Sequence, residues 1–399
     1  MRASKLHALD SARGVAAFVV VVHHAACAFA PALVHDRYAP WLRIAFQGAF
    51  PVRFFFVLSG FVLSLSYFRS GRVGALRSAA VRRFFRLGVP VAAAVAFAYA
   101  LFALGLYFNV PAGVAQHQPP EHRWLHHWYL FTPTATDAAA EAGWRALFEY
   151  DTRHTYNNVL WTMGVEFRGS LFVFALLALV GGLRNRSALY FAVGMVLWRL
   201  GLYHLIDFVA GAALCDWYVA RGAAAGAADR NALAVAALLI AAGLVIGGSA
   251  PADVETAKYY GVAVVPPRLW MTAAAVMVVG GIVYSPAVQS ALVARPLALL
   301  GRMSFSLYLI HVPVFCSLSS WLYLWLTWDG TWGHGPSAAV AAAAGVTTSL
   351  VLGWVGSVTV EPFSIWLGKK VDADVFQPLP GADADGCPPA AHRPGPAPA

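Results

Sequence analysis

Arg13 and His24 are spaced so that both side chains can serve one ligand from one helix. They stand 11 residues apart in an apolar stretch that begins near residue 12. At about 100° per residue this is three turns plus about 20°, so both side chains project from one face, about 16 Å apart along the axis. An imidazole titrates near neutral pH and can accept a proton from a hydroxyl. The spacing therefore predicts a cation near one membrane surface and a proton acceptor deeper in the same helix.

Glu166 is a second ionisable residue in an apolar run, WTMGVEFRGSLFVF. A charge near the bilayer centre costs at least about 2.5–3.5 kcal/mol, so each such residue is a functional candidate. Counted from residue 158 at the outer face, Glu166 lies about 12 Å deep, and counted from residue 12 at the inner face, His24 lies about 18 Å deep. In a hydrocarbon core about 30 Å thick, the two residues therefore reach a similar level. We predict that Glu166 orients the His24 imidazole. A structural pairing of Glu166 with Arg168 or Arg199 is equally compatible with the spacing.

Six arginines and no acidic residue occupy the stretch FRSGRVGALRSAAVRRFFRLGVP, which we expect to be a cytoplasmic loop. Such a run can set the topology and contact anionic lipid without any specific geometry. Because the planar guanidinium suits bidentate phosphate binding, a nucleotide-containing ligand is the alternative. The run consists of Arg69, Arg72, Arg77, Arg82, Arg83 and Arg86.

The segment MSFSLYLIHVPV places Tyr308 and His311 within one helical turn of each other. Pro313 removes a backbone donor and can kink the helix, which exposes polar groups to a cavity. We expect Tyr308 and His311 to line a substrate site. A packed interhelical hydrogen bond is the alternative for His311, and for His23 it is the favoured role.

The composition requires that these residues be positioned by membrane helices. Of the 399 residues, 59% are hydrophobic and 12% charged, and the mean hydropathy is +0.62. These values exclude an ordinary soluble domain and a disordered chain. We predict an all-α polytopic membrane bundle of about ten transmembrane helices. The spans lie near residues 12–33, 47–68, 87–108, 158–182, 188–204, 205–220, 231–250, 269–290, 303–326 and 338–360.

The topology follows from the basic residues. Most of the 28 Lys and Arg residues fall in alternate segments between the spans, which predicts that both termini are cytoplasmic and that the membrane is a plasma or inner membrane. Because this topology accounts for the net charge of +9, we predict no nucleic-acid partner. Residues 109–157 then form a long extracytoplasmic loop. Its histidines, among them His122 and His126, suggest zinc, but no Cys or carboxylate set completes a site, so we predict no metal. We expect one membrane domain over 1–370 and a disordered cytoplasmic tail over 371–399, which is rich in Pro, Ala and Gly.

Five segments in order over residues 9–314 resemble the acyltransferase 3 family of integral membrane proteins. The first, LDSARGVAAFVVVVHH, has the family's Arg and His separated by ten residues, here Arg13 and His24. The second is FFFVLSGFVLS, which contains Ser59. The others are RRFFRLGVP, WTMGVEFRGSLFVF, whose form is similar to that of the fungal-type branch, and MSFSLYLIHVPV. Arg53 and GVEFRG depart from the commoner bacterial wording, which leaves the acceptor unassigned.

The resemblance implies acyl transfer from acyl-CoA, with acetyl-CoA the expected donor, to a hydroxyl of a carbohydrate, lipid or small metabolite. No permanently bound cofactor is implied. Under this interpretation Arg82, Arg83 and Arg86, with Arg13, hold the phosphates of the donor.

We expect the thioester of the donor to reach His24, where the acyl group is transferred. Neutral His24 takes the acceptor proton or carries the acyl group, and Glu166 orients it. Ser59, Tyr308 and His311 complete the expected substrate site. The rival interpretation is a multi-pass solute transporter without acyl transfer, although the sequence has no evident inverted repeat.

Overall fold

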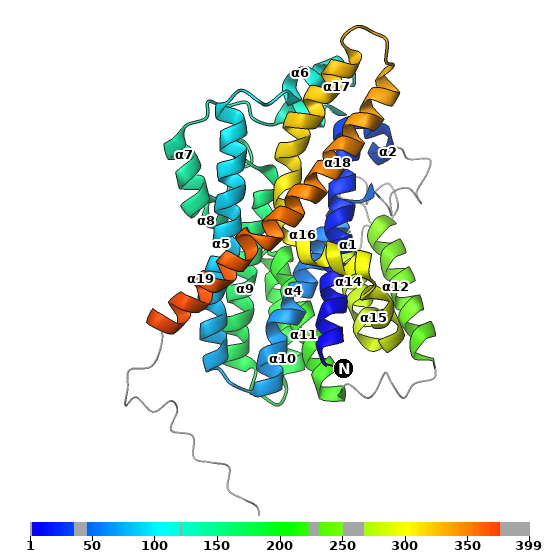
Figure 1. The fold of residues 1–399 in the computed structure, drawn as a ribbon. Coiled ribbons are helices and arrows are strands. Elements are labelled where there is room, and N and C mark those ends of the chain that lie inside the picture. Colours follow the sequence, from blue (N-terminus) through cyan, green and yellow to red (C-terminus); the bar gives the residue numbers. More distant parts are fainter. Residues whose placement is uncertain (1, 36–45, 120–121, 223–230, 250–266, 376–399) are drawn as a thin grey trace, which may run out of the picture.

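The computed structural model describes residues 2–35, 46–119, 122–222, 231–249 and 267–375, and these form an all-α bundle, as predicted (Figure 1). The main helices run roughly along one axis. We call the end that carries residues 104–160 the loop end, and the opposite end, where α1 begins, the basic end. The elements are α1 (Arg2–Phe29), α2 (Pro31–His35), α4 (Ala49–Ser70), α5 (Gly74–Ala103), α6 (Asn109–Ala115), η2 (Trp124–His127), α7 (Ala135–Ala140), η3 (Glu141–Arg145), α8 (Ala146–Phe148), η4 (Asn158–Leu160), α9 (Trp161–Val180), α10 (Arg186–Arg199), α11 (Tyr203–Arg221), α12 (Ala232–Ser249), α14 (Pro267–Tyr284), α15 (Pro286–Leu292), α16 (Arg295–Val314), η5 (Phe315–Ser319), α17 (Ser320–Thr327), α18 (His334–Val358) and α19 (Val360–Val375).

Each predicted span corresponds to a helix, but fewer than ten of these helices are long and apolar enough to cross a membrane alone. Within the described residues seven meet that condition, or eight if α14 and α15, which meet at an angle of 96°, count as one broken span. The two short spans predicted over 188–220 are separate helices, α10 and α11. α10 has only 14 residues, and α11 carries Asp207 and Asp216, so neither is an independent apolar span.

The expected arginine loop is mostly helix, which corrects the prediction for that stretch. α4 ends at Gly71, whose φ of 68° and N–H bond to the Tyr67 carbonyl form a left-handed cap. α5 begins at Gly74, well before the predicted span 87–108. Between Gly74 and Pro90 the chain has no proline and one glycine, Gly88, so the charged residues continue the apolar helix towards the basic end. Arg77, Arg82, Arg83 and Arg86 are therefore residues of α5.

At the other end of the chain, α19 continues to Val375, five residues into the predicted tail. Residues 376–399 lie outside the described residues.

Two helices far apart in the sequence, α1 and α16, run parallel and pack against each other through glycines. A Cβ on Gly14 would lie 2.4 Å from the backbone of Leu300 and Gly301, so the two backbones touch there. Small residues permit such close approach between membrane helices. His24 follows Gly14 by ten residues, and His311 follows Gly301 by ten. A separation of ten is a seven-residue repeat plus three, the spacing that keeps side chains on one seam between parallel helices.

Pro313 makes the seam polar at its upper part. Because proline has no N–H, the carbonyl of Leu309 loses its helical partner. The Asn157 side chain donates to this carbonyl at 2.6 Å. Beyond Val314 the helix widens into the π-helical turn η5, whose Cys316 carbonyl accepts from the Phe108 N–H at 3.0 Å. Polar groups therefore gather where α16 meets the loop end.

Of the short helices that follow α5, α6 and η2 lie at the loop end of the bundle, and α7, η3 and α8 lie beside α5 (Figure 1). The Asn109 amide donates to the carbonyls of Leu125 and Trp128, at 2.8 and 2.9 Å. The Gln116 side chain donates to the Ala28 carbonyl at 2.7 Å. These bonds hold η2 against the end of α1 and bring Trp124 over His24.

The contact between Gly14 and Gly301 predicts that a large side chain destabilises the protein at Gly301 but not at Gly194. Gly301→Leu forces α1 and α16 apart, and we expect a loss of about 1–3 kcal/mol in the free energy of unfolding, as for other overpacked sites. Gly194→Leu is the matched control, because a Cβ at Gly194 meets nothing within 4 Å. The apparent Tm of both purified variants in detergent measures the effect. An unchanged Tm for Gly301→Leu would show that the two backbones are not in contact.

Candidate active site

His24 and His311 form a stacked, hydrogen-bonded pair between α1 and α16. His24 Nδ1 lies 2.7 Å from His311 Nε2, and the ring centroids are 5.0 Å apart with an interplanar angle of 12°. Trp124 also stacks on His24, with centroids 5.3 Å apart. His311 is fully buried, whereas His24 keeps part of its surface open. The ring of His24 is therefore held by aromatic neighbours and one nitrogen partner.

The hydrogen bonds of the pair define its proton positions. His311 Nδ1 lies 3.3 Å from the Leu307 carbonyl, which can only accept, so this nitrogen carries the proton. His311 Nε2 of the neutral ring is then an acceptor, and His24 Nδ1–H donates to it. This inferred network leaves the lone pair of His24 Nε2 available. The pair presents a neutral imidazole in the tautomer that a general base requires.

Glu166 does not meet His24 as expected, because Arg83 and Ser59 occupy its carboxylate. Ser59 Oγ donates to Glu166 Oε1 at 2.5 Å, and the Arg83 guanidinium forms an ion pair with the same carboxylate. Ser170 accepts from Arg83 Nε at 2.9 Å. The helical extension of α5 carries Arg83 to the level of Glu166, which sequence distance alone did not predict. His311, rather than Glu166, orients the imidazole of His24 in this structure.

The alternative partners predicted for Glu166 are also engaged elsewhere or distant. Arg168 Nε donates to the Gly164 carbonyl at 3.1 Å, and Arg199 is exposed at the end of α10.

Arg13 and Arg86 lie close together inside the basic end, but Arg82 does not join them. Arg13 forms an ion pair with Asp10 at 3.0 Å and also interacts with Arg86, which is exposed. Glu361 is near both arginines and accepts bonds from the Ser306 N–H and hydroxyl, at 3.2 and 2.6 Å.

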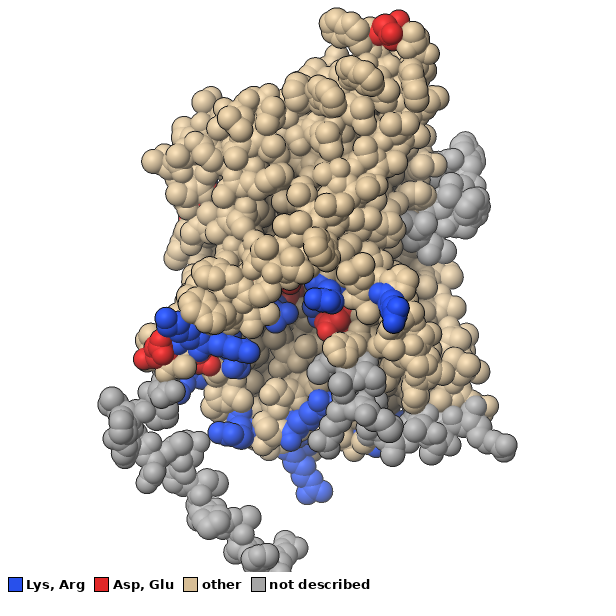
Figure 2. Space-filling model, viewed as in Figure 1, with Lys and Arg blue, Asp and Glu red and all other residues tan. Residues whose placement is uncertain are grey.

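Figure 2 shows charged side chains gathered in the lower part of one face, around a recess. Arg82 pairs with Asp372 at 3.6 Å and is 45% exposed, so it belongs to the surface. Of the four predicted phosphate ligands, Arg13 and Arg86 lie near each other and near Asp10 and Glu361, and the charge of Arg83 is neutralised by Glu166.

A cavity of about 330 Å³ opens beside His24. Tyr308 lines it and shares a hydrogen bond of 3.1 Å with the Thr162 hydroxyl, whereas His311, expected to line a substrate site with Tyr308, is not among the described residues that line this cavity. His23 also lines it and bonds the Phe46 carbonyl just before α4, which fits its predicted hydrogen-bonding role. The remaining polar walls come from Arg53, Asn158, His204 and Arg268, none of which the sequence had marked as site residues.

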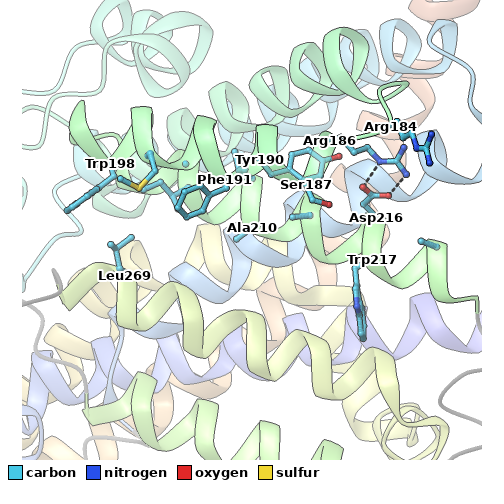
Figure 3. A pocket seen from close by; sticks show the side chains of 16 residues that line it. Arg184, Arg186, Ser187, Tyr190, Phe191, Trp198, Ala210, Asp216, Trp217 and Leu269 are labelled. Atoms are coloured by element: carbon cyan, nitrogen blue, oxygen red, sulfur yellow. Dashed lines mark hydrogen bonds and ion pairs between the residues drawn. The ribbon is translucent and has the colours of Figure 1, made fainter.

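A larger cavity, of about 610 Å³, lies between α10, α11 and the start of α14 (Figure 3). Its walls are mostly apolar, with Phe191 and Trp198 along it and the Arg186–Asp216 ion pair at one end, at 2.5 and 2.7 Å. It holds no histidine and no free carboxylate among its described lining residues. The smaller cavity beside His24 is therefore the candidate active site.

The histidines of the loop end take part in pairwise contacts. Across the part of the chain that the structure describes, no three His, Cys, Asp or Glu side chains are placed to hold a metal ion. His154 bonds Asp137 at 2.8 Å and stacks on Phe131. Burial opposes it, but the hydrogen bonds from His154 and Arg145 lower the pKa of Asp137. These contacts fasten α7 to the chain before α9.

The Glu166–Arg83 pair gives a test of its structural contribution. Glu166→Leu leaves a buried guanidinium without its counter-ion, and we expect a loss of about 3–5 kcal/mol in the free energy of unfolding. The double variant Arg83→Leu, Glu166→Leu should recover most of it. Arg82→Leu at the exposed Arg82–Asp372 pair is the control, with an expected cost of about 0–1 kcal/mol. Additive losses in the double variant would show that the two charges do not stabilise each other.

Comparison with known proteins identifies relatives over most of the chain. Residues 6–357 match the acyltransferase 3 family model, described as an acyltransferase domain. The chain is 26% identical over 371 residues to the O-acetyltransferase PaAT-1 of Phomopsis amygdali, which covers 78% of this chain and 72% of that protein. It is 23% identical over 367 residues to the acyltransferase clz18 of Cochliobolus lunatus, with 78% and 77% covered. No solved structure matches the chain.

Proposed function

Because this chain belongs to the acyltransferase 3 family of integral membrane proteins, we propose that it is an O-acyltransferase that moves an acyl group, acetyl in the first instance, from acyl-CoA to a hydroxyl. The acceptor is a carbohydrate, a lipid or a small metabolite. The observation that carries the proposal is the free lone pair of His24 Nε2, fixed by His311 beside a cavity.

In the proposed reaction, His24 Nε2 removes the proton of the acceptor hydroxyl as the oxygen attacks the thioester carbonyl. The C–S bond then breaks, and the proton passes from His24 to the departing CoA thiolate. His311 Nε2 accepts from His24 Nδ1 throughout and keeps the ring in position. Direct attack of Nε2 on the thioester, giving an acyl-imidazole that the acceptor then cleaves, uses the same lone pair.

The donor site in this proposal lies at the basic end. Arg13 and Arg86 bind the CoA phosphates, and Arg82 contributes from the surface. Arg83 is held by Glu166 and Ser59, so we assign these three residues to shaping the passage between the phosphates and His24 and to keeping α5 against α9. In this proposal the basic end and both termini lie on the cytoplasmic side of a plasma or inner membrane, so the donor enters from the cytosol.

Removal of the imidazole tests the function directly. We expect His24→Ala to lower transfer from [14C]acetyl-CoA by about 10²–10⁴-fold, the usual contribution of a general base, while the protein still folds. The measurement is labelled ester formed by purified protein in vesicles with a panel of hydroxylated acceptors. His127→Ala, an exposed loop-end histidine, is the matched control and should keep full activity. Wild-type turnover in His24→Ala would remove His24 from the mechanism, and uptake of solute without ester would favour a transporter.

The partner histidine predicts a graded series. In His311→Leu the acceptor for His24 Nδ1–H is lost, and we expect kcat to fall on the order of 10²-fold or more, since catalytic imidazoles depend on the group that sets their tautomer. His311→Gln keeps an acceptor oxygen and should retain more activity. The pH profile of kcat should move in both variants, because the titrating group is the neighbouring His24. Equal activity and unchanged profiles in the two variants would contradict the orienting role.

A further inference from the structure

The cavity beside His24 is surrounded by the beginnings of four helices. Ala49 of α4, Trp161 of α9, His204 of α11 and Arg268 of α14 each stand at the first or second position of their helix, and all line the cavity. A helix N-terminus carries about half a positive charge and unpaired N–H groups, which makes it favourable for an anion. Of these ends, α4 has its Ala49 N–H bonded to the Gln47 side chain and α9 continues directly from η4, so their contribution to a positive potential is partial.

The side chains add to this potential. Arg53, Arg168 and Arg268 all lie near His204. Among the described residues that line the cavity, none is acidic. Asp207 lies behind the wall, and its two oxygens are already bonded, to Arg53 at 2.7 Å and to Thr272 at 2.5 Å.

Within the described residues, Arg268 differs from Arg53 in having no carboxylate partner. Its guanidinium lies over the Tyr203 ring, 5.5 Å from the centroid, and is exposed. A cation held in place by an aromatic face, with its hydrogen bonds unused, is available to bind an anion.

Two residues that line the cavity, His204 and Asn158, each have a buried polar atom without a partner within the described chain. They are His204 Nδ1 and Asn158 Oδ1. Buried polar atoms are nearly always hydrogen-bonded, so both side chains keep hydrogen-bonding capacity beside the cavity. The occupant must be small, or a small part of a larger molecule, because the cavity measures about 330 Å³.

We propose that this cavity holds the anionic group, a carboxylate or a phosphate, of the molecule whose hydroxyl is acylated at His24. Arg268 binds the anion, His204 and Asn158 bind polar groups beside it, and the hydroxyl faces His24, which lines the same cavity. The acceptor is thus an anionic hydroxy compound rather than a neutral sugar or sterol. This inference rests on the proposed acyl transfer for the identity of the occupant, but the charge of the cavity is tested without turnover.

Charge-selective thiol labelling measures that property in the full-length protein. Cys27→Ser removes the thiol that lies 3.6 Å from His23, Cys387→Ser removes the cysteine outside the described residues, and Ala49→Cys then places a thiol on the cavity wall. We compare its labelling rates with anionic sulfonatoethyl and cationic trimethylammonioethyl methanethiosulfonate. The same ratio at Leu130→Cys, an exposed loop-end position, is the reference. We expect the anion-to-cation ratio at position 49 to exceed the reference at least about tenfold, as in other charged clefts.

The arginine variants link this ratio to the proposed ligand. Arg268→Gln should lower the ratio at least about threefold, whereas Arg199→Gln, an exposed arginine outside the cavity, should leave it unchanged. A ratio at position 49 equal to the reference, or unaffected by Arg268→Gln, overturns the proposal.

Protection by small alcohols then separates the two anions. Glycerate and glycerol 3-phosphate are compared with glycerol for their ability to slow labelling at position 49. Protection by glycerate alone indicates a hydroxy acid, and protection by glycerol 3-phosphate alone indicates a phosphorylated alcohol or lipid headgroup. Protection by glycerol to the same extent, or by none of the three, overturns the proposal. Absence of acyl transfer with the charge selectivity intact would instead refute the enzyme function and leave an anion site.

Discussion

The contact between α1 and α16 fixes the positions of His24 and His311 relative to each other. Gly14 and Gly301 bring the two backbones together, and ten residues further along each helix a histidine faces the seam. Because the helices are parallel, equal separations return side chains to the same level. The seam positions between them are small or buried, with Ala17 and Val21 on α1 and Ser304 and Tyr308 on α16. A histidine pair at this level is thus a consequence of close packing lower down.

The cost of burying polar groups explains the rest of the bundle. The Leu309 carbonyl freed by Pro313 is paired with Asn157, and the Arg53 charge with Asp207. Each pairing joins two helices or a helix and a loop, so the polar groups also specify which elements meet. Buried polar groups that have no hydrogen-bond partner within the described residues are therefore informative. Two of them, His204 Nδ1 and Asn158 Oδ1, belong to residues that line the cavity beside His24.

The sequence predicts much of this arrangement and misses specific parts for physical reasons. The Arg13–His24 face and the helices themselves follow from periodicity and hydropathy, which act along one segment. The partner of Glu166 does not, because the charge of Arg83 favoured a loop at a place where the backbone continues as helix. Trp124 stacks on His24 from a loop, and Arg268 lines the same cavity from a distant helix; neighbours of that kind leave no periodic signal. The equal spacing of Gly14–His24 and Gly301–His311 is visible in the sequence, but it identifies a seam only when α1 and α16 are known to be neighbours.

The choice of a histidine rather than a carboxylate beside His24 bears on the proposed chemistry. A carboxylate in a region of low dielectric would strongly stabilise the imidazolium and favour a base that keeps the proton. A neutral imidazole fixes the same tautomer and orientation without that charge, so the proton taken from the acceptor is readily passed to the CoA thiolate. Glu166 pairs with Arg83 and is thereby kept from His24. The ion pair between α5 and α9 thus leaves His24 with a neutral partner, His311.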